Sequence, residues 1–426
     1  MSSSEAAADP LKAIRGRGYL VLLVLAGVLG VPISALAWGF LQAVAHLQNL
    51  FYTVLPRGLG FHGVPVWWPL PLLAVSGGLT AAAVSYLPGT GGHEPSEGLR
   101  TGGVATPAML PGILIAALAS ISLGAVIGPE APLIALGGGT AALVVRRMRR
   151  ADERAVRLVG AAGGFAAIST LLGSPLLGAF LLMEASGLGG AALELALLPG
   201  LLAAGIGALI FIGLDSWSGL PSTSLAIPDL PAVQQPNVGQ FGWALVIGVA
   251  GAVLGVLISR SARAAQPYVA CRRMVLTPCA GLLVAGLAIA YAEGTGKGTA
   301  DVLFSGQSGM SPLIEQRAQY TVGTLVLLLA CKGLGYVLSL SAFRGGPVFP
   351  SLYLGAAGGL LMSHLPGLPF VAGIAMGIGA MSAAMLRLPL TSVLLATLLL
   401  GKDGLSVMPL VIVTVVTAYV ITIRLD

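Results

Sequence analysis

Charged residues are scarce in this sequence, since Asp, Glu, Lys and Arg together make up 9% of its 426 residues. Hydrophobic residues make up 56%, and the mean hydropathy is +0.94. A water-soluble fold needs more charge to cover its surface, and a single membrane anchor would not raise the hydropathy of the whole chain. Barrel strands alternate apolar and polar residues, which gives a weaker signal. The composition therefore excludes a soluble enzyme and an outer-membrane barrel, and predicts a polytopic helical membrane protein.

Cysteine and histidine are also scarce. The three cysteines, Cys271, Cys279 and Cys331, are too few and too irregularly spaced for a disulfide framework or a zinc site, and we expect them to pack in the core. The four histidines show no metal-binding spacing, and only His93 falls in a charged, glycine-rich break. We expect no metal, no cofactor and no enzymatic activity.

Positive charge gathers in three short clusters, at Lys12–Arg17, Arg146–Arg157 and Arg260–Arg273, while the net charge is +6. Such clusters between apolar segments are not a nucleic-acid surface, because loops rich in Lys and Arg are typical of the cytoplasmic side of a membrane. The first apolar run lacks a signal-peptide cleavage site. We therefore expect a retained first helix and a cytoplasmic N-terminus.

Glycine and proline interrupt many of the apolar segments, several of which are too short to cross a bilayer alone. In lipid, such breaks are tolerated only where the freed backbone groups are buried in protein or line a watery cavity, so they indicate an ion path. The predicted apolar segments are 18–48, 66–87, 108–127, 131–145, 155–185, 192–214, 240–262, 274–292, 318–342, 348–366, 368–386 and 389–423.

The two halves of the chain carry the same motif. Gly128–Pro132 reads Gly-Pro-Glu-Ala-Pro and Gly346–Pro350 reads Gly-Pro-Val-Phe-Pro, at an offset of 218 (346 − 128). Farther along, Pro175-Leu176 and Pro389-Leu390 repeat at an offset of 214 (389 − 175). Ordered matches at nearly one offset indicate an internal duplication.

The duplication suggests how the chain is organised. We predict a cytoplasmic segment 1–17, a first transmembrane repeat 18–215, an inter-repeat loop 216–240 and a second transmembrane repeat 241–426. A basic cluster follows the first Gly-Pro motif and none follows the second, which indicates that the halves have opposite orientations. Inverted repeats place broken helices and their binding site near the membrane midplane.

Both Gly-Pro motifs are typical of helix N-termini, because proline at a first helical position loses only an N–H that would be unpaired. Helix N-termini carry free N–H groups and partial positive charge, so two that face each other favour an anion. Glu130 lies inside the first motif, and an ionisable group amid apolar residues in a membrane marks a functional site. Its carboxylate can occupy the anion's place when charged and leave it when protonated, although a purely structural cap is the alternative. Glu184 lies in another apolar run, where a structural cap or ion pair is the stronger interpretation.

With these motifs the sequence resembles the CLC family of chloride channels and chloride/proton antiporters, from about residue 20 to residue 423. Gly91–Pro95 stands where the family has Gly-Ser-Gly-Ile-Pro, Gly128–Pro132 where it has Gly-Arg/Lys-Glu-Gly-Pro, and Gly346–Pro350 where it has Gly-x-Phe-x-Pro. Ser174–Gly178 and Arg387–Thr391 resemble its two Pro-Leu segments.

The resemblance implies a fold of two inverted halves with many broken and tilted helices. It implies a multi-pass homodimer in a bacterial inner membrane, with chloride or a similar small anion, protons and lipid as partners. Glu130 would be the gating glutamate. The anion-binding positions that it implies are Gly91, Gly92, His93, Gly128, Ala131, Gly346, Val348 and Phe349.

Several positions depart from the family pattern. The serine that binds the central anion falls on Gly92, unless His93 substitutes for it, and the opposing tyrosine falls near Asp403 or Gly404. The inner proton-relaying glutamate aligns with Ala185, one residue past Glu184.

Pro129 and Pro347 replace N–H donors, so we expect weaker anion binding. Our first hypothesis is a chloride/proton antiporter of atypical coupling. The alternatives are a passive anion channel and, third, a proton-coupled carrier of an organic solute.

Overall fold

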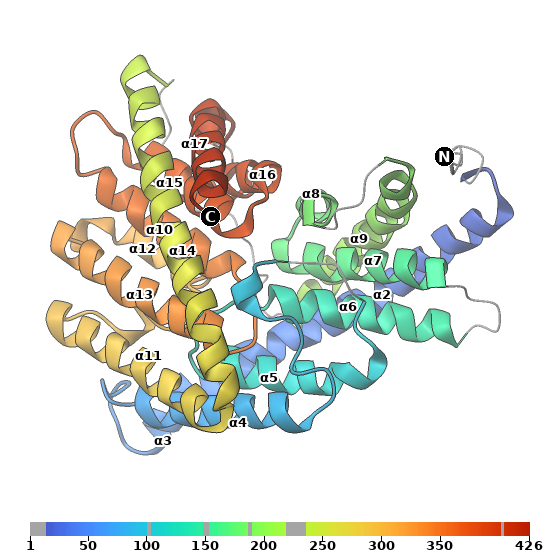
Figure 1. The fold of residues 1–426 in the computed structure, drawn as a ribbon, viewed down its shortest axis with the longest axis horizontal. Coiled ribbons are helices and arrows are strands. Elements are labelled where there is room, and N and C mark those ends of the chain that lie inside the picture. The colour runs from blue at the N-terminus through green and yellow to red at the C-terminus, as the bar shows by residue number, and fades with distance from the viewer. Residues whose placement is uncertain (1–13, 100–103, 148–152, 186–189, 219–235, 402–403) are drawn as a thin grey trace. The chain divides into compact units, whose positions relative to one another are not determined.

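The computed structural model describes residues 14–99, 104–147, 153–185, 190–218, 236–401 and 404–426, which form helices joined by loops (Figure 1). Eight of the described helices are long and apolar enough to cross a membrane. The predicted all-α polytopic fold is therefore confirmed. The principal helices are α2 (Arg17–Asn49), α4 (Pro69–Tyr86), α5 (Leu110–Ser122), α6 (Glu130–Arg146), α7 (Glu153–Leu172), α8 (Pro175–Ala185), α9 (Gly190–Ser218), α10 (Val238–Cys271), α11 (Arg273–Thr295), α13 (Val322–Ala342), α14 (Val348–Met362), α15 (Phe370–Leu386), α16 (Pro389–Leu399) and α17 (Gly404–Leu425).

Several predicted boundaries are wrong. The apolar run 155–185 is two helices, because Gly173 takes a φ of +61° and Pro175 starts α8. The run 389–423 is likewise divided between α16 and α17. The basic cluster Arg260–Arg273, expected in a loop, lies mostly on α10, since Arg is a good helix former.

The inter-repeat loop is shorter at both ends than the predicted 216–240, because α9 continues to Ser218 and α10 begins at Val238. Residues 219–235 of that segment, like the basic residues between 148 and 152, lie outside the described residues. Cys331 is buried as expected. The expectation of core packing is wrong for Cys271 and Cys279, which are exposed: the first ends α10, and the second lies on the outer surface of the apolar helix α11.

One compact unit comprises residues 1–42, 100–111 and 132–224. Within it, α7 packs against α8 and α9. Helices α6 and α7 approach each other so closely at Gly137 and Gly163 that a Cβ on either glycine would collide with the carbonyl oxygen of the other.

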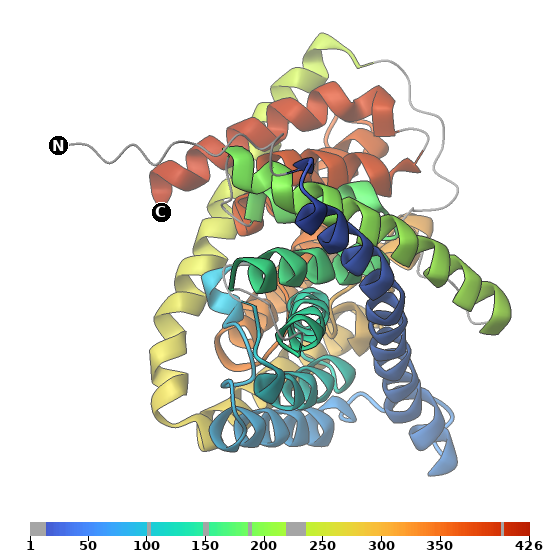
Figure 2. The ribbon, with the colours of Figure 1, turned by 90° about the vertical axis from the view of Figure 1, so that its right-hand side faces the viewer.

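The other compact unit comprises residues 43–99, 112–131 and 225–426, and so includes the first Gly-Pro motif as well as the second. Helix α4 packs against α11, and the two lie side by side in both ribbon views (Figure 1, Figure 2). Helix α10 packs against α15 and α17, and α14 packs against α15. This unit contains residues of both predicted repeats, so it does not show where either repeat begins or ends. The repeat boundaries stay a prediction.

The end of α17 is tied to its neighbours by an ionic cluster. The Asp426 carboxylate accepts from Arg263 on α10 and from Arg387, which caps α15. The hydrogen bond from Arg263 and the adjacent Arg387 hold the pKa of Asp426 below its usual range, although partial burial acts in the opposite direction.

The helix order supports the duplication. Helices α5 to α9 are followed in the second half by α13 to α17, each repeat having a motif helix, α6 or α14, and a helix that begins with the proline of the Pro-Leu pair, α8 or α16. Gly355 and Gly377 make the same mutual contact between α14 and α15 that Gly137 and Gly163 make between α6 and α7. Since 355 − 137 is 218 and 377 − 163 is 214, these pairs have the offsets of the sequence motifs.

Candidate functional site

The two Gly-Pro motifs meet through their backbones. The N–H of Gly128 donates to the carbonyl of Gly346 over 2.8 Å, and the N–H of Gly346 donates to the carbonyl of Gly128 over 2.6 Å. Such a reciprocal exchange, in which equivalent residues contact each other, is what a two-fold axis between the repeats requires.

Two serines repeat this reciprocity on either side of the bridge. The N–H of Val126 donates to Ser339 Oγ at 2.9 Å, and the N–H of Arg344 donates to Ser120 Oγ at 3.2 Å. The donors differ by 218 residues (344 − 126) and the acceptors by 219 (339 − 120). Each motif is therefore held by a serine from the opposite half, as an inverted repeat predicts.

Glu130 is the first residue of α6, and its carboxylate lies at the N-terminus of α14. The N–H of Phe349 donates to Glu130 Oε1 at 2.9 Å, and the side chain is fully buried. Glu130 Oε2 has no hydrogen-bond partner among the described residues. A carboxylate with one oxygen on a helix N-terminus and the other unpaired occupies a place that suits a small anion.

Two glycines leave the space that this carboxylate fills. A Cβ on Gly128 would lie 2.6 Å from Glu130 Cδ, and a Cβ on Gly346 would lie 2.8 Å from the same atom and collide with Oε2. A side chain at either position would therefore have to displace the carboxylate.

Two prolines lie next to this position. Pro347 precedes α14 and Pro350 is its third residue, so neither offers an N–H, and the N–H of Phe349 between them donates to the carboxylate. The Tyr336 hydroxyl donates to the Pro347 carbonyl over 2.7 Å and fixes the motif from α13. The weaker anion binding expected from Pro129 and Pro347 stays a prediction. Val348 is fully buried beside Phe349, and Ala131 is partly buried on α6.

The segment that carries Gly91, Gly92 and His93 forms a left-handed turn. Gly91 and Gly92 have φ values of +70° and +91°, and the N–H of Gly92 donates to the Gly89 carbonyl at 2.8 Å. Glycine adopts this conformation without the steric cost that other residues meet. The His93 ring bonds the carbonyl of Gly98 at 2.9 Å, so its side chain is engaged within its own loop.

The sequence interpretation missed a charged cluster beside this turn. The Arg344 guanidinium donates to the Thr90 carbonyl at 3.1 Å and to Glu94 Oε1 at 3.2 Å, and Arg273 Nη2 lies 3.8 Å from the same oxygen. Gln266 also donates to the Glu94 carboxylate. One signal was available, because Arg344 stands two residues before Gly346 and Glu94 lies within the Gly91–Pro95 motif. Their pairing could not be predicted from a single sequence, because the two residues are 250 positions apart.

A buried lysine was also missed. Lys332 lies midway along α13, is fully buried, and sits 4.4 Å from the centre of the Tyr353 ring. Its ammonium supplies hydrogen bonds to carbonyl groups that would otherwise be unpaired at membrane depth. The segment it holds packs on the loop leading to Glu130, since the N–H of Phe304 donates to the Gly124 carbonyl at 3.2 Å. Lys332 Nζ lies within hydrogen-bond distance of four carbonyls, which share its three N–H groups: Asp301, Val302, Leu303 and Phe304, at 3.0, 3.0, 3.1 and 3.3 Å.

The predictions for Glu184 and for the family's inner tyrosine concern α8 and the start of α17. Glu184 is half-buried near the C-terminal end of α8, followed by Ala185 as the last residue of that helix. Asp403 lies outside the described residues, and Gly404 is the first residue of α17.

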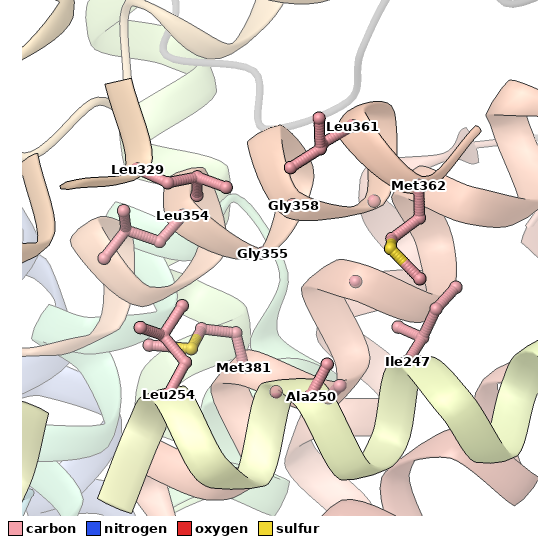
Figure 3. A pocket seen from close by; sticks show the side chains of 14 residues that line it. Ile247, Ala250, Leu254, Leu329, Leu354, Gly355, Gly358, Leu361, Met362 and Met381 are labelled. Atoms are coloured by element: carbon pink, nitrogen blue, oxygen red, sulfur yellow. The ribbon is translucent and has the colours of Figure 1, made fainter. Parts of the chain in front are cut away.

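An apolar cavity of about 140 Å³ lies between α10, α13, α14 and α15 (Figure 3). Leu254, Leu354, Met362 and Met381 point toward it, and all 14 of its lining residues are glycine or apolar. A small anion needs donors or positive charge, so this cavity does not suit one. Among the described residues, no group of three or more His, Cys, Asp or Glu side chains is placed to hold a metal ion.

Comparisons with known proteins match this chain to ion-transport proteins. Residues 85–422 match the family model described as voltage gated chloride channel. An ion-transport protein named YfeO from Escherichia coli O7:K1 (strain IAI39 / ExPEC) is 25% identical over 361 residues, covering 83% of this chain and 82% of the relative.

Solved structures share the fold. A slow cyanobacterial Cl⁻/H⁺ antiporter superposes with a TM-score of 0.75 at 20% identity, and a CLC-type fluoride/proton antiporter with a TM-score of 0.70 at 18% identity; each match covers 95% of both chains. A eukaryotic CLC transporter superposes with a TM-score of 0.72 at 18% identity, over 96% of this chain and 72% of that one.

Proposed function

Since the chain belongs to the voltage gated chloride channel family, whose function is anion transport, we propose that it exchanges a small inorganic anion for protons, with Glu130 as the group that both species require. The observation that carries this proposal is the Glu130 carboxylate on the N–H of Phe349, with its second oxygen unpaired. The antiporters that share the fold transport chloride or fluoride with protons, which supports the same class of activity here.

The geometry suggests how one group can serve both species. While Glu130 is ionised, its carboxylate occupies the position at the N-terminus of α14 and excludes an anion from it. Protonation removes the charge that holds the carboxylate there, because a helix N-terminus stabilises negative charge. An anion then takes the position, and its departure allows Glu130 to release the proton and return.

A passive anion channel is the second candidate. The observation that favours it is Pro347 before α14, which offers no N–H, so the position has one donor fewer for an anion. The alignment of the family's inner proton-relaying glutamate with Ala185 favours the same alternative. In such a channel Glu130 would gate the path without returning protons across it.

The same proposal includes the setting of the chain. We infer a homodimer in a bacterial inner membrane, with the N-terminus cytoplasmic. The basic residues Arg260 to Arg273, at the junction of α10 and α11, then mark the cytoplasmic end of these helices.

Proton pumping by a chloride gradient distinguishes the candidates. Purified protein is reconstituted in liposomes with an outward chloride gradient and equal pH, the membrane potential is clamped, and chloride and proton movements are recorded together. We expect the native protein to move protons inward as chloride leaves. Glu130→Gln should carry chloride without protons, because an amide does not titrate in this range.

Glu293→Gln is the matched control, because Glu293 is an exposed glutamate near the end of α11. It should behave as the native protein does. Chloride movement without protons in the native protein would favour the channel, and no chloride movement at all would contradict anion transport by this chain.

A further inference from the structure

The charged cluster at Glu94 has the composition of an anion site. Three donor side chains from different parts of the fold converge on one carboxylate: Arg344 from the loop before α14, Arg273 from the first position of α11, and Gln266 from α10. Two guanidinium groups and one amide recognise a small anion as readily as they recognise a carboxylate.

The donors are better fixed than the carboxylate. The Arg344 side chain is 4% exposed and is held on its other sides by the carbonyls of Thr90 and Phe343, at 3.1 and 3.3 Å. The Glu94 side chain is 29% exposed and comes from the loop between α4 and α5. It can therefore leave while the buried guanidinium stays in place.

The charges do not cancel. Arg344 and Arg273 contribute two positive charges against one from Glu94, and the nearest other acidic group on this loop, Glu97, is exposed and lies 4.0 Å from His93. Without Glu94, a buried cation would remain unpaired, which is strongly unfavourable in a protein interior. A mobile anion from solution would restore the balance.

We propose that Arg344, Arg273 and Gln266 form a second anion-binding site, and that the Glu94 carboxylate is its tethered occupant, displaced when a transported anion passes. The proposal rests on the proposed function for the class of ligand, a small monovalent inorganic anion, and for the cytoplasmic placement of Arg273. Arg344 connects this site to the second Gly-Pro motif, because Gly346 follows it by two residues and pairs with Gly128.

The chain then has two carboxylates that act as anion mimics. Glu130 occupies the N-terminus of α14, and Glu94 occupies the arginine site next to the preceding loop. An anion that leaves the first position toward the cytoplasm would meet the second, where its affinity depends on competition with Glu94.

Bromide binding to purified protein tests this site. Thermal unfolding of the native protein, Glu94→Gln and Glu94→Gln/Arg273→Gln is measured in sodium gluconate in which bromide replaces gluconate at constant ionic strength. A ligand that binds only the folded state raises the melting temperature with its concentration. We expect Glu94→Gln to melt low in gluconate and to be stabilised by bromide with an apparent affinity about tenfold higher than the native protein.

Adding Arg273→Gln should abolish that gain, while Arg272→Gln in the same background should preserve it, because Arg272 is the exposed neighbour with the same charge. A low melting temperature of Glu94→Gln that bromide does not raise would overturn the proposal and leave Glu94 as a structural partner of Arg344.

Arg273→Gln alone keeps the Glu94–Arg344 pair and covers the case in which Glu94→Gln does not fold. It should raise the half-saturating bromide concentration for transport from the cytoplasmic face by several-fold, and an unchanged value would contradict the site. Failure of the proposed function would appear differently, as native protein that transports no anion.

Discussion

At the scale of single residues, the Glu130 carboxylate fills the space at the N-terminus of α14 that a side chain at residue 346 would need. The carboxylate is there because glycine leaves room for it, and the N–H of Phe349 gives it a donor. The motif predicted the helix start, since its proline is visible in the sequence, while the role of Glu130 stays a prediction. The clusters around Arg344 and Lys332 were not predicted, because each joins segments that are far apart in the chain.

A methyl group at residue 346 should evict the carboxylate. In Gly346→Ala the new Cβ collides with Glu130 Oε2, while the backbone bonds to Gly128 remain and φ at this position is not in the left-handed region. We expect chloride efflux from liposomes to continue while proton movement falls by roughly tenfold or more relative to the native protein, as expected for Glu130→Gln.

Gly358→Ala on the same helix is the control, because a Cβ there meets nothing within 4 Å. It should leave both fluxes unchanged. Full proton coupling in Gly346→Ala would show that the carboxylate does not need this space.

At the scale of helices, the sequence predicts where apolar segments lie better than where helices end. Hydropathy cannot detect the break between α7 and α8, because the residues on both sides are apolar and the break depends on the left-handed φ of Gly173 followed by Pro175. It also misplaces the end of α10, because arginine ends an apolar run without ending a helix. The repeat offsets were reliable because they come from glycines and prolines that the backbone needs.

The contact between α14 and α15 should tolerate no added volume at Gly377. A Cβ there would collide with the Gly355 carbonyl oxygen and lie 2.8 Å from the backbone nitrogen of Gly359, and both are main-chain atoms that cannot move aside alone. We expect Gly377→Ala to lose about 1–3 kcal/mol of stability, the usual cost of overpacking, measured as a lower melting temperature in detergent.

Gly333→Ala on α13 provides the comparison, since a Cβ at Gly333 meets nothing within 4 Å and alanine favours a helix by up to about 1 kcal/mol. Its melting temperature should be equal to or higher than that of the native protein. Equal stability of the two variants would contradict the close contact between α14 and α15 at Gly377.

At the scale of the whole molecule, the Gly128 and Gly346 segments of the two predicted repeats lie together, and the one carboxylate of the two motifs, that of Glu130, lies beside them. The reciprocal bonds between Gly128 and Gly346, and from each half to the serine of the other, are the arrangement that an internal duplication predicts. The acid belongs to one repeat only, because Val348 stands where the second motif would place it. The pseudo-symmetric scaffold thus carries an asymmetric site, which fits the proposed role of Glu130 as a competitor of the anion.

The most direct test is the location of bromide in crystals of Glu130→Ala, found by anomalous scattering and compared with native crystals grown under the same conditions. We expect a bromide peak at the backbone N–H of Phe349 in the variant, where the carboxylate lies in the native protein, and a weaker or absent peak there in native crystals. A variant whose α14 N-terminus is intact but holds no bromide would contradict the claim that Glu130 occupies an anion's place.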